Sequence, residues 1–142
     1  MEKRGDFKLS FGMIFSIFLM VIFIAFAVYA ITKFIDTQHT IQIEKFKDDL
    51  QNDVDAMWQS SGENSREVKY FLPDKITFVC FTDDEYELEN MYFVSEEIIG
   101  GEFIEHLDLT SLVEDPYCIE NINGEINFVI SKDYGETLVR IE

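Results

Sequence analysis

The residues that could carry out chemistry are few, and their spacing suits no common active site. The two histidines, His39 and His106, have no cysteine or carboxylate at a recognised metal-ligand spacing. The chain contains no glycine-rich phosphate loop, no G-x-S-x-G elbow and no Cys-x-x-Cys pair. Because no nucleophile can be paired with a base, we expect no enzymatic activity, no catalytic residue and no cofactor.

An acidic cluster is the one group that could collect a hard cation such as calcium. It comprises Asp83, Asp84, Glu85, Glu87 and Glu89. The alternation of its glutamates is typical of the solvent face of a strand, where charge also discourages edge-to-edge aggregation. The 12-residue ligand pattern of an EF-hand is missing, so we expect no metal site.

Two cysteines, Cys80 and Cys118, leave two alternatives open. If both lie outside the cell on neighbouring strands, a disulfide would close a loop of about 38 residues and stabilise the fold by roughly 4 kcal/mol. Otherwise they are thiols that pack as small hydrophobic side chains.

The elements that must position these residues begin with a long apolar run. Leu9 to Thr32 are 24 consecutive uncharged positions between Lys8 and Lys33. As a helix they would span about 36 Å, enough for a hydrocarbon core of about 30 Å. This length favours a retained transmembrane anchor over a cleaved signal peptide. Its aromatic side chains could contact lipid or neighbouring helices, and we favour lipid.

The charge distribution predicts an orientation and excludes one class of partner. Acidic residues outnumber basic ones 28 to 11, which argues against nucleic-acid binding. Lys3, Arg4 and Lys8 precede the apolar run, and the chain from Asp36 onward has 7 basic and 26 acidic residues, a balance of −19. The positive-inside rule therefore places the N-terminus in the cytoplasm and the C-terminal domain outside the cell membrane.

An amphipathic helix follows the apolar run. Apolar residues recur at helical spacing at Ile43, Phe46, Leu50, Val54 and Met57, and we expect the helix to end near Gly62. The stripe covers about two heptads, so we expect it to pack on the chain's own C-terminal domain rather than in a coiled coil.

Beyond Gly62 the apolar period changes from that of a helix to that of strands. Strands are expected at 67–72, 75–82, 86–95, 117–122, 125–131 and 137–141, whereas 102–107 is ambiguous after Gly100-Gly101. The fold class is α+β, one long helix on a small antiparallel sheet. The expected segments are a basic cytoplasmic stretch 1–8, a transmembrane helix 9–32, an amphipathic helix 33–61 and a β head 62–142.

Asn123-Gly124 predicts a two-residue hairpin turn. The corresponding register pairs Ile119 with Phe128 and Tyr117 with Ile130, so that one apolar face faces the helix. Cys118 would then lie on the opposite face.

Lys3-Arg4-Gly5, the phenylalanine- and isoleucine-rich span, the continuing helix and the small sheet with two cysteines resemble type IV pilin-like proteins, particularly archaeal ones. The segments 10–17 and 48–58 are also similar to archaeal membrane proteins. The pilin resemblance implies peptidase cleavage between Gly5 and Asp6 and homo-oligomers formed through the N-terminal helix.

The function expected is a structural or interaction role at the cell surface, with membrane lipid and a surface protein as partners. Assembly of a processed subunit into a filament is the first alternative, and an anchored enzyme is a second, less favoured one. The usual glutamate at the fifth mature position is Ser10 here, and Lys8 would precede the apolar run, so we favour an uncleaved anchor.

Overall fold

A computed structural model describes residues 10–83, 88–96 and 98–142. The chain divides into two compact units, residues 1–38 and residues 39–142. We call the second unit the head. The boundary falls within a helix, so the last 21 residues of that helix, 39–59, belong to the head.

The helix, α1, extends over Phe11–Gln59. No glycine or proline interrupts the chain between Gly12 and Gly62, which explains its length. The predicted transmembrane and amphipathic segments are thus one continuous element. At its end the Ser60 N–H donates to the Met57 carbonyl, and Gly62 adopts a φ of 111°. A left-handed backbone at that position favours glycine.

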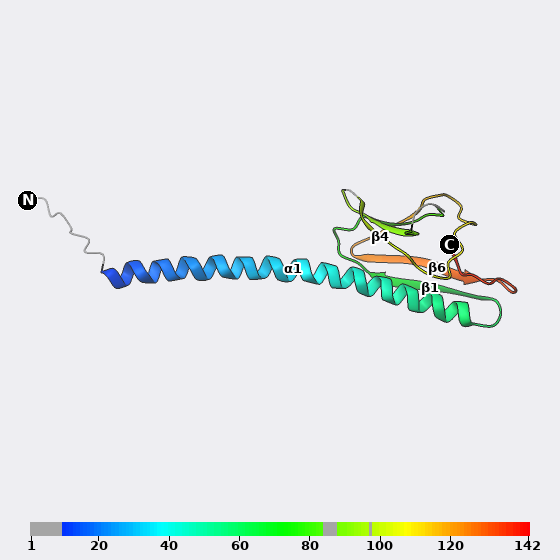
Figure 1. The fold of residues 1–142 in the computed structure, drawn as a ribbon, viewed down its shortest axis with the longest axis horizontal. Coiled ribbons are helices and arrows are strands. Elements are labelled where there is room, and N and C mark those ends of the chain that lie inside the picture. Colours follow the sequence, from blue (N-terminus) through cyan, green and yellow to red (C-terminus); the bar gives the residue numbers. More distant parts are fainter. Residues whose placement is uncertain (1–9, 84–87, 97) are drawn as a thin grey trace, which may run out of the picture. The chain divides into compact units, whose positions relative to one another are not determined.

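Within the part of the chain that the structure describes, seven strands form two antiparallel sheets rather than the single sheet expected. One sheet has the order β1-β6-β7, and the other has the order β4-β3-β2-β5. The strands are β1 (Asn64–Phe71), β2 (Phe78–Phe81), β3 (Met91–Val94), β4 (Ile98–Glu102), β5 (Tyr117–Glu120), β6 (Glu125–Lys132) and β7 (Arg140–Ile141). Figure 1 shows β1 running back along the last part of α1.

The core of the head lies where α1 and both sheets meet. Phe46 of α1 contacts Tyr70 of β1 and Phe93 of β3 edge to face, with ring centroids 5.2 and 5.8 Å apart. Phe128 of β6 packs against Tyr70 and against Phe81 of β2. These contacts make α1 an integral wall of the head, as the α+β prediction requires.

The predicted hairpin is right at its turn and wrong in its strand pairing. Asn123 and Gly124 both have positive φ, and Ile122 and Glu125 exchange two backbone hydrogen bonds across them. Beyond that bridge the chains diverge, because β5 pairs with β2 whereas β6 pairs with β1. The predicted opposition of Ile119 to Phe128 and of Tyr117 to Ile130 therefore does not occur.

The divergence has a physical cause at Asn121. Its backbone N–H donates to the Thr77 carbonyl, and its side-chain amide donates to the Pro73 and Ile76 carbonyls. These bonds hold β5 against β2. The apolar residues of the expected hairpin still reach one core: Ile126, Phe128 and Ile130 are buried, and Tyr117 and Ile119 pack against them.

The segment left ambiguous contains the end of a strand and a loop. β4 includes Gly100 and Gly101 and ends at Glu102, so the two glycines lie within a strand instead of breaking one. Residues 103–108 form a loop that touches the C-terminal segment through a bridge between Leu107 and Val139. The last strand, β7, is shorter than predicted.

Candidate functional site

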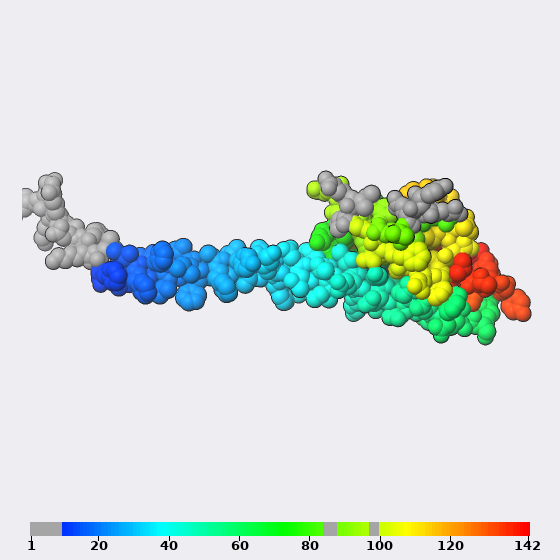
Figure 2. All heavy atoms as spheres, in the orientation of Figure 1, coloured from blue at the N-terminus to red at the C-terminus, as the bar shows by residue number. Residues whose placement is uncertain are grey.

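The first surface of interest is the apolar part of α1. Every described residue from 10 to 38 is exposed, and Figure 2 shows their side chains at the surface. The exposed aromatic residues are Phe11, Phe15, Phe18, Phe23, Phe26, Tyr29 and Phe34. This helix is long and apolar enough to cross a membrane. The expected processing site, Gly5 and Asp6, lies outside the described residues.

The same helix becomes the spine of the head. Phe46, Leu50, Val54 and Met57 are buried to 3% exposure or less, and Ile43 packs against them. Their helical spacing keeps them on the side of α1 that faces the two sheets. The five residues predicted from the sequence to pack on the head all do so.

Polar groups fasten α1 to β1 at the margin of this apolar contact. The Tyr70 hydroxyl donates to Asp53 Oδ2 over 2.7 Å, and Arg66 donates to Asp53 Oδ1. Burial, and secondly this bond to a carboxylate, raise the pKa of Tyr70 well above its ordinary value of 10.0. Tyr70 therefore stays protonated and serves as a hydrogen-bond donor.

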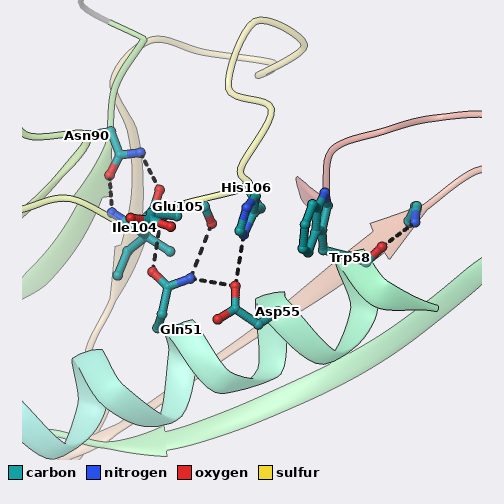
Figure 3. Close-up of polar contacts among 8 residues, drawn as sticks. Gln51, Asp55, Trp58, Asn90, Ile104, Glu105 and His106 are labelled. Carbon is teal, nitrogen blue, oxygen red and sulfur yellow. Dashed lines mark hydrogen bonds and ion pairs between the residues drawn. The ribbon is translucent and has the colours of Figure 1, made fainter.

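A second group of contacts, which we call the clasp, joins α1 to the loop after β4. The clasp comprises Gln51, Asp55 and Trp58 of α1 with Glu105 and His106 of the loop (Figure 3). The Glu105 N–H donates to Gln51 Oε1 over 2.9 Å, and His106 Nδ1 lies 2.9 Å from Asp55 Oδ1. The His106 ring stacks on Trp58 with centroids 3.8 Å apart.

Asn90 holds the other side of the same loop. Its side-chain amide donates to the Ile104 carbonyl and accepts from the Ile104 N–H, each over 2.8 Å (Figure 3). His106 itself has a φ of 66°, an uncommon conformation outside glycine. The loop is thus fixed from both sides, and the strained residue is held by Asp55 and Trp58.

The clasp contains a histidine–carboxylate pair, which is one part of a nucleophilic site. Among the described residues, no serine, threonine or cysteine side chain is hydrogen-bonded to the His106 ring. One ring nitrogen is engaged by Asp55, and one face is covered by Trp58. These contacts fasten the loop after β4 to α1.

Lys132 adds a third set of contacts between α1 and the sheets, at the C-terminal end of the helix. Its side chain is 8% exposed, and its ammonium donates to the Trp58 and Ser60 carbonyls over 2.7 and 3.0 Å. Carbonyls at a helix C-terminus lack partners within the helix and carry the negative end of its dipole. A buried cation at this position both donates hydrogen bonds to these carbonyls and interacts favourably with the negative end of the dipole.

Cys80 and Cys118 form a disulfide between β2 and β5. They are directly opposite in the register, with Cα atoms 4.0 Å apart. Cys80 is buried whereas Cys118 is exposed, on the opposite side of β5 from Tyr117 and Ile119. Of the two alternatives left open by the sequence, the structure contains the cross-link.

The described residues contain no group of three or more histidine, cysteine, aspartate or glutamate side chains suited to a metal ion. Asp84, Glu85 and Glu87 of the acidic cluster lie outside the described residues. The expectation that this cluster holds no calcium ion therefore stays a prediction. His39 lies at the start of the head part of α1, far along the helix from the clasp.

The clasp could not be predicted from the sequence because it joins distant parts of the chain. Asp55 and His106, for example, are 51 positions apart. The available signals were weak ones: Trp58 beside the apolar stripe, and a lone histidine in a segment of ambiguous structure. The chain matches no protein-family model, no curated protein and no solved structure with significant similarity.

Proposed function

We propose that this chain is a single-pass membrane protein of pilin-like architecture whose head lies outside the cytoplasm and has a structural or interaction role at the cell surface. One observation carries the proposal: the fully exposed apolar part of α1 continues, without a break, into the buried spine of a disulfide-linked head.

Lipid is the partner that we propose for this apolar segment. Exposed side chains such as Phe11 (85%) and Phe26 (68%) would be costly in water, at about 25 cal/mol for each Å² of apolar surface. A bilayer removes that cost, and the backbone of a helix is already satisfied internally. Packing among several copies of this helix would bury the same side chains in part.

Two independent features support the orientation. Lys3, Arg4 and Lys8 favour a cytoplasmic N-terminus. The disulfide between Cys80 and Cys118 suits an oxidising compartment, because cytosolic thiols are normally kept reduced. Both features support a head that lies outside the cytoplasm.

The role is non-enzymatic in this proposal, because the clasp and the ion pairs of the head serve to hold its elements together. The alternative is a processed subunit that assembles into a filament through its N-terminal helix. The motif Arg4-Gly5 before Asp6 favours that alternative, whereas Lys8 and Ser10 favour an intact anchor.

The first test is the intact mass and N-terminal sequence of the chain extracted from its native membrane without reduction. We expect the segment up to Gly5 to be retained, with or without the initiator Met1, and a mass two units below that of the dithiol. A chain beginning at Asp6 would make the filament subunit the leading function. A chain beginning near Val28 would overturn the anchor.

The second test concerns orientation. On intact cells, a membrane-impermeant amine reagent should label Lys75, which is exposed on the head, and should leave Lys3 unlabelled until the cells are permeabilised. Peptide mapping separates the two sites. Labelling of Lys3 with protection of Lys75 would reverse the orientation and refute the proposal.

A further inference from the structure

The apolar part of α1 contains a seven-residue repeat. Isoleucine recurs at every seventh position, at Ile17, Ile24 and Ile31. A second series with the same period contains only β-branched residues, and its members are Ile14, Val21, Val28 and Ile35. A sustained period of seven is typical of helices that pack along one another as a coiled coil.

The repeat places these residues on one side of the helix. Positions seven apart nearly coincide in projection, because two helical turns take 7.2 residues, and the series drifts by only about 20° in each heptad. Positions three or four residues away fall on the same side. We call the resulting surface the heptad face, and it comprises Met13, Ile14, Ile17, Met20, Val21, Ile24, Ala27, Val28 and Ile31.

The aromatic side chains of the apolar run are kept off the heptad face. They lie on the rest of the helix circumference, at Phe11, Phe15, Phe18, Phe23, Phe26 and Tyr29. Both sides of the helix are exposed in the single chain, as Figure 2 shows. The helix thus has one side of bulky rings and one side of β-branched, methionine and alanine side chains.

The residue types of the heptad face favour packing between helices. Within lipid, helices gain little from the hydrophobic effect and associate through close packing instead. Isoleucine and valine lose little entropy on packing, because a helix already restricts their χ1 angle. Ala27 is small enough to let two backbones approach closely. β-branched residues at the first position of a heptad are typical of parallel two-stranded coiled coils.

A second copy of the chain is the occupant that the heptad face fits. Copies of a single-pass anchor share one orientation, so their helices run parallel and each residue of the repeat meets its own counterpart. Eight of the nine residues of the heptad face are 52% to 66% exposed in the single chain. Burying about 60 Å² of each side chain on both copies would remove about 1,000 Å² in total, which is the lower limit for a specific interface.

We propose that two copies of this chain pair in the membrane through the heptad face, as a parallel left-handed coiled coil whose aromatic side contacts lipid. The inference rests on the proposed membrane anchor and names a partner for it. The pair is closed, since the same face is used on both copies. It requires no cleavage at Gly5 and differs in this from an open filament of processed subunits.

Energy transfer between full chains measures the pairing. Chains with a donor or an acceptor dye at residue 142 are reconstituted together in phosphatidylcholine vesicles. We expect transfer that saturates with the protein-to-lipid ratio and rises linearly with the acceptor fraction, as for a pair. Ile24→Phe should weaken association at least tenfold, because a ring at the centre of the heptad face holds the helices apart. Ile22→Phe is the matched control on the aromatic side and should stay within twofold of the unaltered chain.

Cysteine cross-linking maps the face that is used. The unaltered chain has no free cysteine, so it should give no cross-linked pair on oxidation. Single replacements within 17–24 should cross-link most strongly at Ile17→Cys, Met20→Cys and Ile24→Cys. They should cross-link least at Phe18→Cys and Ile22→Cys, which lie on the aromatic side.

Flotation of the same vesicles separates a failure of the pair from a failure of the anchor. A chain that does not float with the vesicles would refute the anchor and the pair together. Four results from a chain that floats would overturn the heptad face and leave the anchor standing. They are an absence of energy transfer, equal effects of Ile24→Phe and Ile22→Phe, cross-linking that peaks on the aromatic side, and an acceptor dependence that requires more than two copies.

Discussion

Individual residues fix the connection between the two sheets of the head. Asn123 and Gly124 have φ values of 55° and 80°. A Cβ added at Gly124 would lie 2.9 Å from Asp74 Oδ1 and 3.2 Å from the Leu72 carbonyl oxygen. Glycine is thus required there both by the backbone conformation and by the close approach of a neighbouring chain segment.

Gly124→Ala should therefore destabilise the head by about 1–2 kcal/mol. Gly100→Ala is the matched control, because an added Cβ there meets nothing within 4 Å and φ is not positive. Thermal unfolding in detergent can be followed by the fluorescence of Trp58, the single tryptophan. The first variant should melt roughly 5 °C or more below the second. Equal melting temperatures would contradict the close approach at the turn.

Tyr70 makes a contribution to the stability of the head that is lost at alkaline pH. Its pKa is raised in the folded state, chiefly by burial, so the folded chain holds the proton where the unfolded chain has lost it. Its contribution is complete below pH 10 and declines as pH rises above that value. Tyr70→Phe should cost about 1 kcal/mol at pH 7 and should flatten the stability loss above pH 10. An unchanged alkaline slope in urea unfolding would refute this role.

At the scale of elements, the stripe of α1 was predictable because its period is set locally. Leu50 lies at its centre and is fully buried. Leu50→Ala should cost about 2–5 kcal/mol, through lost transfer free energy and the cavity left behind. Ile41→Ala on the same helix, where the side chain is 56% exposed, should cost less than about 0.5 kcal/mol. Comparable losses from both changes, measured by unfolding in detergent, would contradict the burial pattern.

The pairing of strands was not predictable in the same way. The Asn123-Gly124 pair specifies a turn, but the strands on either side of it are assigned to different sheets by contacts from distant residues. Asn121 bonds to Pro73 and Ile76, 45 or more positions earlier in the chain. The clasp has the same character, since Gln51 and Asp55 meet a loop more than 50 positions away. Strand β4, which contains Gly100 and Gly101, was not predicted, because its pairing with β3 supports a strand where the local sequence does not favour one.

At the scale of the whole molecule, charge opposes contact between copies. The chain carries a net charge of −17, and nearly all the acidic residues follow the apolar segment. Like charges repel over a Debye length, which is about 30 Å at 0.01 M salt and about 10 Å at 0.1 M. Association of heads should therefore be weakest at low ionic strength.

Sedimentation of the full chain in detergent should show this dependence. Raising the salt concentration from about 0.01 to 0.5 M should increase self-association, and millimolar calcium should do so at constant ionic strength. Magnesium serves as a control for a general divalent effect. Sedimentation that is independent of both salt and calcium would show that charge does not regulate contact between heads.

The antiparallel course of β1 along the last part of α1 has a mechanical consequence. A pull on the head against its helix would load the seam between α1 and the sheets in shear, because the contacts from Phe46 to Met57 lie side by side along the direction of force. They would have to break together rather than one after another. The clasp and the Lys132 bonds lie near the C-terminal end of α1 and would hold that end of the contact in place. We therefore expect the contact between α1 and the sheets to resist a pull along the helix more than a pull across it.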